Sequence, residues 1–182
     1  IMGAGSAAVT AALKSFRGVK HRLQRVGELD GIAFIDDSKA TNVDSAVKAV
    51  ESIKGESVIL LGGKDKGYAY EPLFEALKKS GVVHAVIYGE NAFRVLNAAL
   101  KSGYTAVTLC RPFDMAVRVA YLTAKRGQNV LLSPASASFD SFRSYEERGE
   151  RFAEMLSILA SERVKGEIVT DGGGVGETSE IE

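Results

Sequence analysis

Short apolar segments alternate with helical patterns along the middle of this 182-residue chain, and this alternation limits the folds available to it. Successive apolar segments begin a little over twenty residues apart, which leaves room for one helix between each pair. Such spacing is typical of βαβ units, whose crossovers are almost always right-handed. Parallel strands are expected at 57–61, 84–88, 106–110 and 129–132.

An antiparallel hairpin is predicted to precede these strands. Segments 22–29 and 32–37 flank Asp30-Gly31, a dipeptide that strongly favours a two-residue turn. Helical patterns cover 43–53, 71–79, 91–101, 113–125 and 146–159. Glycines that follow three of them predict left-handed helix ends: Gly81, Gly103 and Gly127. The fold class is therefore α/β, with a Rossmann-like, mostly parallel sheet, one antiparallel strand and helices on both faces.

Composition and charge exclude several classes of function. The 23 basic and 23 acidic side chains cancel, whereas a nucleic-acid or anionic-membrane binder needs a basic excess. Cys110 is the only cysteine, which excludes an intramolecular disulfide and a cysteine-based zinc site. No apolar run approaches the roughly 20 residues that span a bilayer, and we expect no signal peptide. We therefore expect a cytoplasmic monomer that neither binds nucleic acid nor inserts into a membrane.

The chain divides into three parts by composition. Residues 1–20 are expected to hold an alanine-rich helix from Ser6 to Phe16, the last helix of a preceding domain that this sequence lacks. Residues 21–165 form the α/β domain. Residues 166–182 hold five acidic side chains, five glycines and no Lys or Arg, so we expect a flexible acidic tail.

The loop after segment 32–37 concentrates polar groups at the place where α/β sheets bind ligands, beyond the carboxyl ends of the strands. Two carboxylates, two hydroxyls, an ammonium and an amide are brought together by residues 36–42 (Asp-Asp-Ser-Lys-Ala-Thr-Asn). Helix capping accounts for the Ser, Thr and Asn taken singly. The set as a whole indicates a ligand site.

Two further strand ends carry related chemistry. Segment 57–61 is followed by Gly-Gly-Lys-Asp-Lys-Gly (62–67), where glycines permit close backbone approach and Lys66 offers a charge to phosphate or carboxylate. Segment 129–132 is followed by hydroxyl and aromatic residues: Ser133, Ser136, Ser138, Phe139, Phe142 and Tyr145. These residues could form a polar pocket with apolar walls, or an ordinary loop whose aromatic rings dock on the core.

Three other residues are weaker candidates. His21 precedes Arg22 at the entry to the hairpin, where a cation could meet a phosphate. His84 begins a buried strand and is expected to be structural. Cys110 ends a strand and, without an evident base partner, is interpreted as a small core residue rather than a nucleophile.

Taken together, these motifs resemble the C-terminal domain of the Mur ligases, most closely the members that add D-glutamate, over about residues 7–160. The likeness is carried by ordered motifs: His21-Arg22, Asp37-Ser38-Lys39-Ala40-Thr41-Asn42, Gly62-Gly63-x-x-Lys66, Ser133-Pro134-Ala135-x-Ala137-Ser138-Phe139-Asp140 and Phe142-x-x-Tyr145-Glu146-x-Arg148-Gly149. Members that add L-alanine or a diamino acid would show a Tyr-Ala-His type sequence, and those that add the diamino acid an Asn-Pro-Arg element. This chain has neither, and folate polyglutamate ligases lack the Asp-Ser-Lys-Ala-Thr-Asn string.

The resemblance implies an ATP-dependent ligase of peptidoglycan synthesis. ATP would phosphorylate the carboxylate of UDP-N-acetylmuramoyl-L-alanine, and the D-glutamate amine would attack the resulting acyl phosphate. Arg22, Asp37 and Lys39 would face the nucleotide, with Lys39 catalytic beside its phosphates. The residues implied for D-glutamate are Thr41, Lys66, Ser138, Phe139 and Tyr145. ATP and Mg²⁺ are the implied cofactors, with the metal ligands mostly on an absent central domain and none assigned in this chain.

The chain also departs from the family pattern. It lacks the P-loop, acidic metal ligands and modified lysine of the central domain, and the UDP-binding N-terminal domain. The isolated chain is therefore expected to be inactive, and those two domains are its implied partners. Ser136 stands where the family often has cysteine, a harmless change if the residue only packs. Tyr145 replaces a common phenylalanine.

Three alternatives from other classes remain open at this point. A receiver-like signalling domain also has paired acids followed by Ser, and 122–125 (Leu-Thr-Ala-Lys) imitates its Thr-x-Lys end. Against it, Thr123 and Lys125 fall within a helical pattern. A nicotinamide-binding domain would need Gly-x-Gly-x-x-Gly where residues 37–42 stand. The third alternative is an engineered, isolated folding module without activity.

Overall fold

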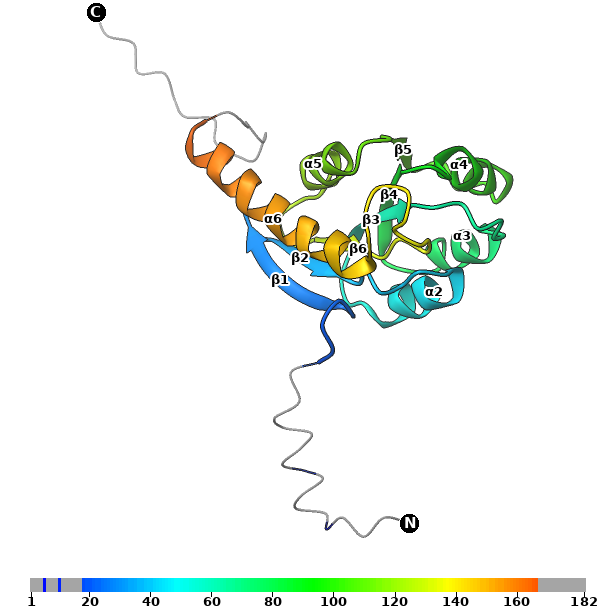
Figure 1. Ribbon diagram of the computed structural model, residues 1–182, viewed down its shortest axis with the longest axis horizontal. Helices are drawn as coiled ribbons and strands as arrows, with labels where there is room; N and C mark the ends of the chain where they lie inside the picture. Colours follow the sequence, from blue (N-terminus) through cyan, green and yellow to red (C-terminus); the bar gives the residue numbers. More distant parts are fainter. Residues whose placement is uncertain (1–4, 6–9, 11–17, 167–182) are drawn as a thin grey trace, which may run out of the picture.

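The computed structural model describes residues 5, 10 and 18–166, which form one six-stranded sheet with the order β1-β2-β6-β3-β4-β5 (Figure 1). The strands are β1 (Gln24–Leu29), β2 (Ile32–Asp36), β3 (Ser57–Gly62), β4 (Val82–Tyr88), β5 (Val107–Leu109) and β6 (Asn129–Leu132). The helices are α2 (Val43–Ser52), α3 (Glu71–Leu77), α4 (Ala92–Lys101), α5 (Phe113–Thr123) and α6 (Tyr145–Val164). Of the pairings between these six strands, β1–β2 alone is antiparallel, which confirms the predicted fold class.

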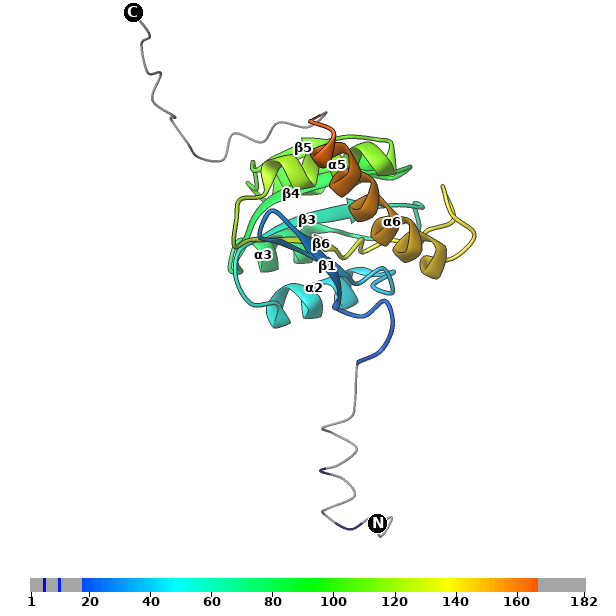
Figure 2. The same ribbon diagram turned by 90° about the vertical axis from the view of Figure 1, so that its left-hand side faces the viewer.

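The sheet lies between two layers of helices, α2 to α4 on one face and α5 with α6 on the other (Figures 1 and 2). Strand β3 shows why its sequence is a continuous apolar run. Ile59 and Leu61 pack in the core under α2 to α4, whereas Val58 and Leu60 pack in the core under α5 and α6. Because successive side chains of a strand point to opposite faces, a central strand covered on both sides needs apolar residues throughout.

The predicted hairpin is confirmed. Asp30 and Gly31 both have positive φ, +52° and +77°, as a tight hairpin turn of this kind requires. The Tyr121 hydroxyl of α5 donates a hydrogen bond to Asp30 Oδ2 (2.5 Å), which ties the turn to the helix layer. Strand β1 thus covers one edge of the parallel sheet.

The structure changes several predicted boundaries. Strand β6 has the predicted bounds, but α6 continues five residues beyond position 159, to Val164. Contacts with neighbouring elements explain the extension, because Arg118 of α5 pairs with Glu162 and Arg163 donates to Asp30 at 3.1 Å. The last turn therefore has partners that helical periodicity alone cannot reveal.

The predicted left-handed helix end is confirmed at Gly103, with φ of +70°. At Gly127 φ is also positive, +88°, but α5 ends at Thr123 with an extended C-cap at Ala124, so this glycine belongs to the turn that follows. The prediction is wrong at Gly81 as well. Helix α3 already ends at Leu77, four residues earlier. Gly81 instead lies where the backbone passes close to Gly55, since an added Cβ would stand 2.7 Å from the Gly55 carbonyl oxygen. This glycine serves close packing of two loops rather than a helix end.

Two predicted segments fall outside the described residues. They are the helix over 6–16, of which only Thr10 is described, and the tail beyond Gly166. Among the helices of the described residues, none combines the length and apolar character that crossing a bilayer requires.

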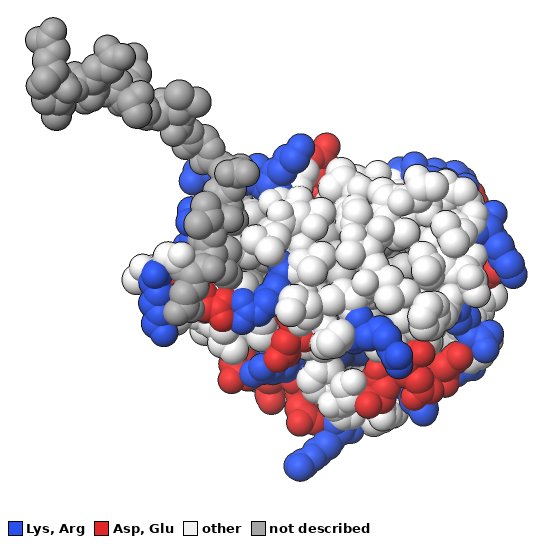
Figure 3. Space-filling model, turned by 90° about the horizontal axis from the view of Figure 1, so that it is seen from above, with Lys and Arg blue, Asp and Glu red and all other residues white. Residues whose placement is uncertain are grey.

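The face that α4, β5 and α5 form carries little charge. Seen from above, uncharged side chains fill its middle and charged ones gather along its rim (Figure 3). Exposed apolar side chains on the two helices are Phe93, Leu100, Met115 and Leu122.

Helix α6 packs closely against the residues around the end of β2 at Gly149. An added Cβ there would lie 2.3 Å from His21 Nδ1, 2.5 Å from Asp36 Oδ2 and 2.6 Å from Ser38 Oγ. These three side chains are buried, so they have little room to move away. The absence of a side chain at position 149 thus sets the position of the first turns of α6.

We predict that Gly149→Ala lowers the free energy of unfolding by about 1–3 kcal/mol, because the helix must shift away from a hydrogen-bonded cluster. Gly27→Ala is the matched control. Its new methyl group would meet only the end of the Leu156 side chain, at 2.5 Å, and this flexible end can rotate away. Urea unfolding of both variants tests the comparison, and equal losses would contradict the role assigned to position 149.

Candidate functional site

The three polar loops identified in the sequence lie at one edge of the sheet. They follow β2, β6 and β3, which are consecutive in the sheet and run parallel. Their carboxyl ends therefore open on the same side, where α/β sheets place ligands.

Asp37 is the buried carboxylate of the loop after β2. Only 4% of the residue is exposed, and its oxygens accept hydrogen bonds from the Ser133 hydroxyl (2.7 Å) and the Leu23 N–H (3.2 Å). Burial raises the pKa of Asp37 to about 6, although both hydrogen bonds and the charge of Arg22 oppose the rise. A carboxyl group whose pKa is raised by burial, beside an exposed cation such as Arg22, is typical of functional sites.

The neighbouring Asp36 has a structural role. Its Oδ2 lies 2.7 Å from His21 Nδ1, and its Oδ1 accepts a hydrogen bond from the Ser38 N–H at 2.8 Å. Both Asp36 and His21 are buried, and the Tyr145 ring packs edge-on against His21. His21 is thus held inside by Asp36, and Arg22 alone of this predicted pair is exposed to a ligand.

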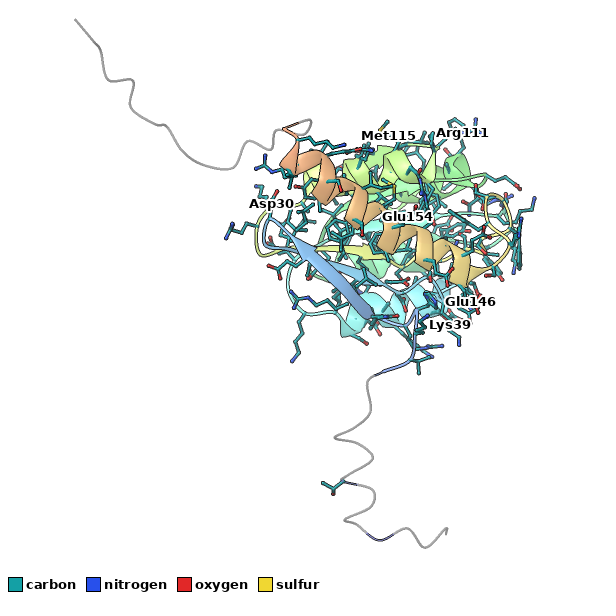
Figure 4. All side chains as sticks on the ribbon, turned by 60° about the vertical axis from the view of Figure 1, so that its left-hand side comes forward. Asp30, Lys39, Arg111, Met115, Glu146 and Glu154 are labelled. Atoms are coloured by element: carbon teal, nitrogen blue, oxygen red, sulfur yellow. The ribbon has the colours of Figure 1, made fainter. Side chains whose placement is uncertain are left out.

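Lys39, in the loop after β2, lies beside the first turn of α6, near Glu146 (Figure 4). Its Nζ is 5.5 Å from the centroid of the Tyr145 ring, a distance at which a cation and an aromatic face attract. The Thr41 N–H donates to the Lys39 carbonyl at 2.9 Å, so the two residues share one tight turn. A hydrogen bond from Tyr145 lowers the pKa of Glu146.

The loop after β3 is joined directly to the loop after β6. Gly62 and Gly63 have φ of +129° and +144°, and an added Cβ would lie 1.9 Å from the Tyr88 carbonyl oxygen or 2.2 Å from that of Ala137. The Lys64 N–H then donates to the Ala137 carbonyl at 2.9 Å. The glycines are therefore needed for backbone contact between adjacent loops.

The loop after β6 is buried from Ser133 to Ser138. The Ser138 carbonyl accepts hydrogen bonds from the N–H groups of Ser141 (3.1 Å) and Phe142 (2.9 Å). Phe142 docks on the core, with its ring centroid 5.0 Å from that of Phe113. Phe139, by contrast, is 65% exposed, so the two aromatic residues have different roles.

The structure brings some of the predicted site residues together. The charge of Arg22 acts on Asp37, Lys39 contacts Tyr145, and Lys66 and Ser138 lie on loops that share the Lys64–Ala137 contact. Within residues 18–166, the exposed side chain of Lys66 makes no hydrogen bond or ion pair, and the ring of Phe139 is exposed. That all five acceptor residues converge on one ligand stays a prediction.

Two residues outside the predicted set organise these loops. Arg148 is fully buried, and its Nη2 donates to the carbonyl oxygens of Ser38 and Ser136, each at 2.9 Å. It shares the buried stripe of α6 with Phe152 and Met155, so helical spacing was a signal that could have identified it. The second residue, Asn91, bonds to Ser136, which therefore does more than pack.

A cleft of about 570 Å³ adjoins the loop after β3. Asp65, Tyr70, Asn91 and Arg94 are among its lining residues, and Arg94 Nε donates to Asp65 at 2.9 Å. None of the residues predicted to hold the acceptor amino acid lines this cleft. In the part of the chain that the structure describes, no three or more His, Cys, Asp or Glu side chains are grouped to hold a metal ion.

Comparison with known proteins identifies similar sequences. Residues 21–136 match the family described as "Mur ligase, glutamate ligase domain". The chain is 39% identical over 159 residues to a UDP-N-acetylmuramoylalanine–D-glutamate ligase of Lactobacillus delbrueckii subsp. bulgaricus. This match covers 87% of this chain and 34% of the relative. A ligase of the same name from Geobacter sp. (strain M21) is 47% identical over 143 residues, with coverage of 78% and 30%. The chain thus spans about a third of the length of the curated relatives it matches.

The fold is similar to that of solved ligases. The crystal structure of UDP-N-acetylmuramate-alanine ligase from Thermotoga maritima matches with a TM-score of 0.61 at 18% identity, over 86% of this chain and 34% of that one. At this identity the likeness concerns the fold alone.

We predict that Asp37 makes stability fall as pH rises. Its pKa is about 6 in the folded chain, against 3.8 as the ordinary value, so the folded state binds more protons between these limits. Asp37→Asn removes this group, and the free energy of unfolding of the variant relative to the parent should rise by about 1–2 kcal/mol between pH 4.5 and 7.5. Urea unfolding at both pH values measures the difference.

Ser133→Ala gives a second test of the same carboxyl group. Loss of the hydroxyl that favours the ionised form should raise the pKa of Asp37 further, as NMR titration of the carboxyl carbon would show. An unchanged titration in Ser133→Ala, or equal pH dependence in Asp37→Asn and the parent, would contradict this account.

Proposed function

The chain belongs to the Mur ligase family, and from this premise we propose that it is the C-terminal domain of an ATP-dependent ligase of peptidoglycan synthesis. The ligase joins D-glutamate to UDP-N-acetylmuramoyl-L-alanine. One observation carries the proposal: Asp37 and Lys39 follow β2 at the edge of the sheet where the loops with Lys66 and Ser138 also begin. The proposal is supported by two relatives that are 39% and 47% identical to this chain and are named as D-glutamate ligases.

The loop after β2 serves the nucleotide. Arg22 is exposed and Lys39 half-buried, so both can place a positive charge against phosphate oxygens. Lys39 is assigned the catalytic role, because a fixed cation stabilises the charge that develops during phosphoryl transfer. Asp37 faces the nucleotide from a buried position fixed by Ser133. ATP supplies the phosphoryl group that activates the carboxylate of the substrate.

The other loops serve the acceptor amino acid. Lys66 can pair with a carboxylate of D-glutamate, and the Ser138 and Thr41 hydroxyls can donate to it. Phe139 and Tyr145 supply aromatic surface beside these polar groups. Strand ends hold the residues, so the site is expected to be largely preformed before the acceptor binds.

The proposal also assigns the parts that this chain does not contain. Mg²⁺ is assigned mostly to ligands on a central domain, and the UDP group to an N-terminal domain. Residues 1–20 are assigned to the end of the central domain, 21–165 to the C-terminal domain and 166–182 to a tail. The ligase is assigned to the cytoplasm, as a monomer.

The alternatives gain no support. Thr123 lies within α5 rather than at the end of a strand, which is where a receiver-like domain would place it. The turn after β2 carries Asp37 and Lys39 in place of the glycines that a nicotinamide-binding turn needs. Relatives named as ligases also give no support to an inactive folding module.

We expect the isolated chain to show no ligase activity, because it lacks the P-loop of the family. Phosphate release that depends on UDP-N-acetylmuramoyl-L-alanine and D-glutamate tests this. The ligase completed with the other two domains is the positive control, and it should show that release. Turnover by the chain alone would contradict the division of labour, and a completed ligase that ignores D-glutamate would refute the function.

Two variants of the completed ligase separate the roles within the loop after β2. Lys39→Ala should raise the catalytic barrier by on the order of 2–4 kcal/mol, through lost stabilisation of phosphate charge. Thr41→Ala should mainly raise the KM for D-glutamate. Steady-state kinetics with each substrate varied in turn measures both effects, and a reversed pattern would show that the two assignments are wrong.

A further inference from the structure

Asn91, just before α4, is a buried hub whose amide group is fully used. Only 2% of the residue is exposed. The Asn91 Oδ1 accepts a hydrogen bond from the Gly63 N–H at 3.0 Å, and the backbone N–H of Asn91 donates to the Gly63 carbonyl at 3.1 Å. Because the Gly63 N–H can only donate, it fixes which end of the Asn91 amide is oxygen. Asn91 therefore holds both backbone groups of Gly63.

The other end of the Asn91 amide reaches two further elements. Its Nδ2 donates to the Tyr70 hydroxyl (2.6 Å) at the start of α3 and to Ser136 Oγ (2.9 Å) in the loop after β6. Tyr70 and Ser136 are themselves 2.9 Å apart, oxygen to oxygen, and both are buried. Burial raises the pKa of Tyr70, so its hydroxyl stays neutral and able to donate. We call these three residues the Asn91 network.

The Asn91 network joins two loops that are close in space but distant in sequence. Gly63 precedes Lys66 by three residues, and Ser136 precedes Ser138 by two. The Lys64–Ala137 hydrogen bond (2.9 Å) lies between these points, so the two loops are fastened at successive positions. Buried polar groups in a fully bonded network rigidify their surroundings, because any displacement leaves one of them unpaired.

We propose that Asn91 is a positioning residue, which with Tyr70 and Ser136 fixes the separation of the Lys66 and Ser138 side chains and so sets recognition of the acceptor amino acid. The inference rests on the proposed function. Asn91 itself contacts neither substrate in this account. Its effect is transmitted through the backbone of Gly63 and Ser136.

The nucleotide loop is anchored by other contacts. Asp37 is held by Ser133 and by the Leu23 N–H, and Asp36 by His21. None of these hydrogen bonds involves the Asn91 network, and the link from Ser38 to Ser136 through Arg148 uses the Ser136 carbonyl rather than its hydroxyl. A loss of the network should therefore affect the acceptor amino acid more than ATP, whereas general destabilisation would affect both.

The first test uses this chain and does not depend on the function. Amide hydrogen exchange followed by NMR should show the Gly63 N–H exchanging at least about tenfold faster in Asn91→Ala than in the parent. The Asp37 N–H, which donates to the Leu132 carbonyl at 2.8 Å, is the reference and should change little. Unchanged exchange at Gly63 would overturn the proposal.

The second test uses the completed ligase. Tyr70→Phe removes one hydroxyl from the network and should raise the KM for D-glutamate about threefold, and Asn91→Ala should raise it about tenfold. The KM for ATP should stay within about twofold in both variants. Tyr121→Phe is the matched control, since it also removes a hydrogen-bonded hydroxyl from a buried tyrosine but at the hairpin turn. It should leave both constants unchanged.

The outcomes separate this proposal from the proposed function. If the unmodified ligase does not use D-glutamate, the function is refuted and the acceptor role falls with it, whatever exchange shows at Gly63. If that ligase is active but Tyr70→Phe leaves the KM for D-glutamate unchanged, or raises both KM values equally, positioning alone is overturned. Should Asn91→Ala fail to fold, Tyr70→Phe still decides the question, because it removes a single oxygen.

Discussion

The arrangement of the strand ends depends on one buried cation. The Arg148 guanidinium is fully enclosed, and the carbonyl oxygens of Ser38 and Ser136 accept hydrogen bonds from it. A charge withdrawn from water is costly unless fixed dipoles surround it, so each carbonyl must keep its position. Two loops that are far apart along the chain are thereby held at one point. Helix α6 must therefore pack where its first turns place the Arg148 side chain between these loops.

Other polar groups at this edge of the sheet are also held by internal hydrogen bonds, so the edge can carry many of them and remain ordered. Asp36 and His21 are hydrogen-bonded to each other, Ser133 donates to Asp37, and Asn91 accepts from the Gly63 N–H. These internal pairs leave Arg22 and Lys66 exposed for a ligand. The division is physical: groups within the hydrogen-bonded layer give rigidity, and the long cationic side chains above it give attraction for anions.

Much of the fold follows from local signals, and the organisation of the site does not. Apolar runs and the Asp30-Gly31 turn predict the sheet and its antiparallel edge, because these patterns act over neighbouring residues. The loops with Asp37, Lys66 and Ser138 were predicted to meet, since parallel strands end on one side. Arg148 was identifiable from the buried stripe of α6. Asn91 was not, because its partners come from three distant segments and an asparagine before a helix suggests only a cap.

The glycine pair after β3 has a consequence for how this domain can diverge. No L-amino acid with a side chain fits at Gly62 or Gly63, since a Cβ would penetrate the carbonyl oxygens of Tyr88 and Ala137. Substitutions, whether they arise in evolution or by design, are therefore excluded at these two positions and can occur only at neighbouring residues. Side chains can vary more freely just after the pair, at 65–69, where none of the residues is buried. The turn thus separates two positions closed to any side chain from a short surface stretch that ends at the buried Tyr70.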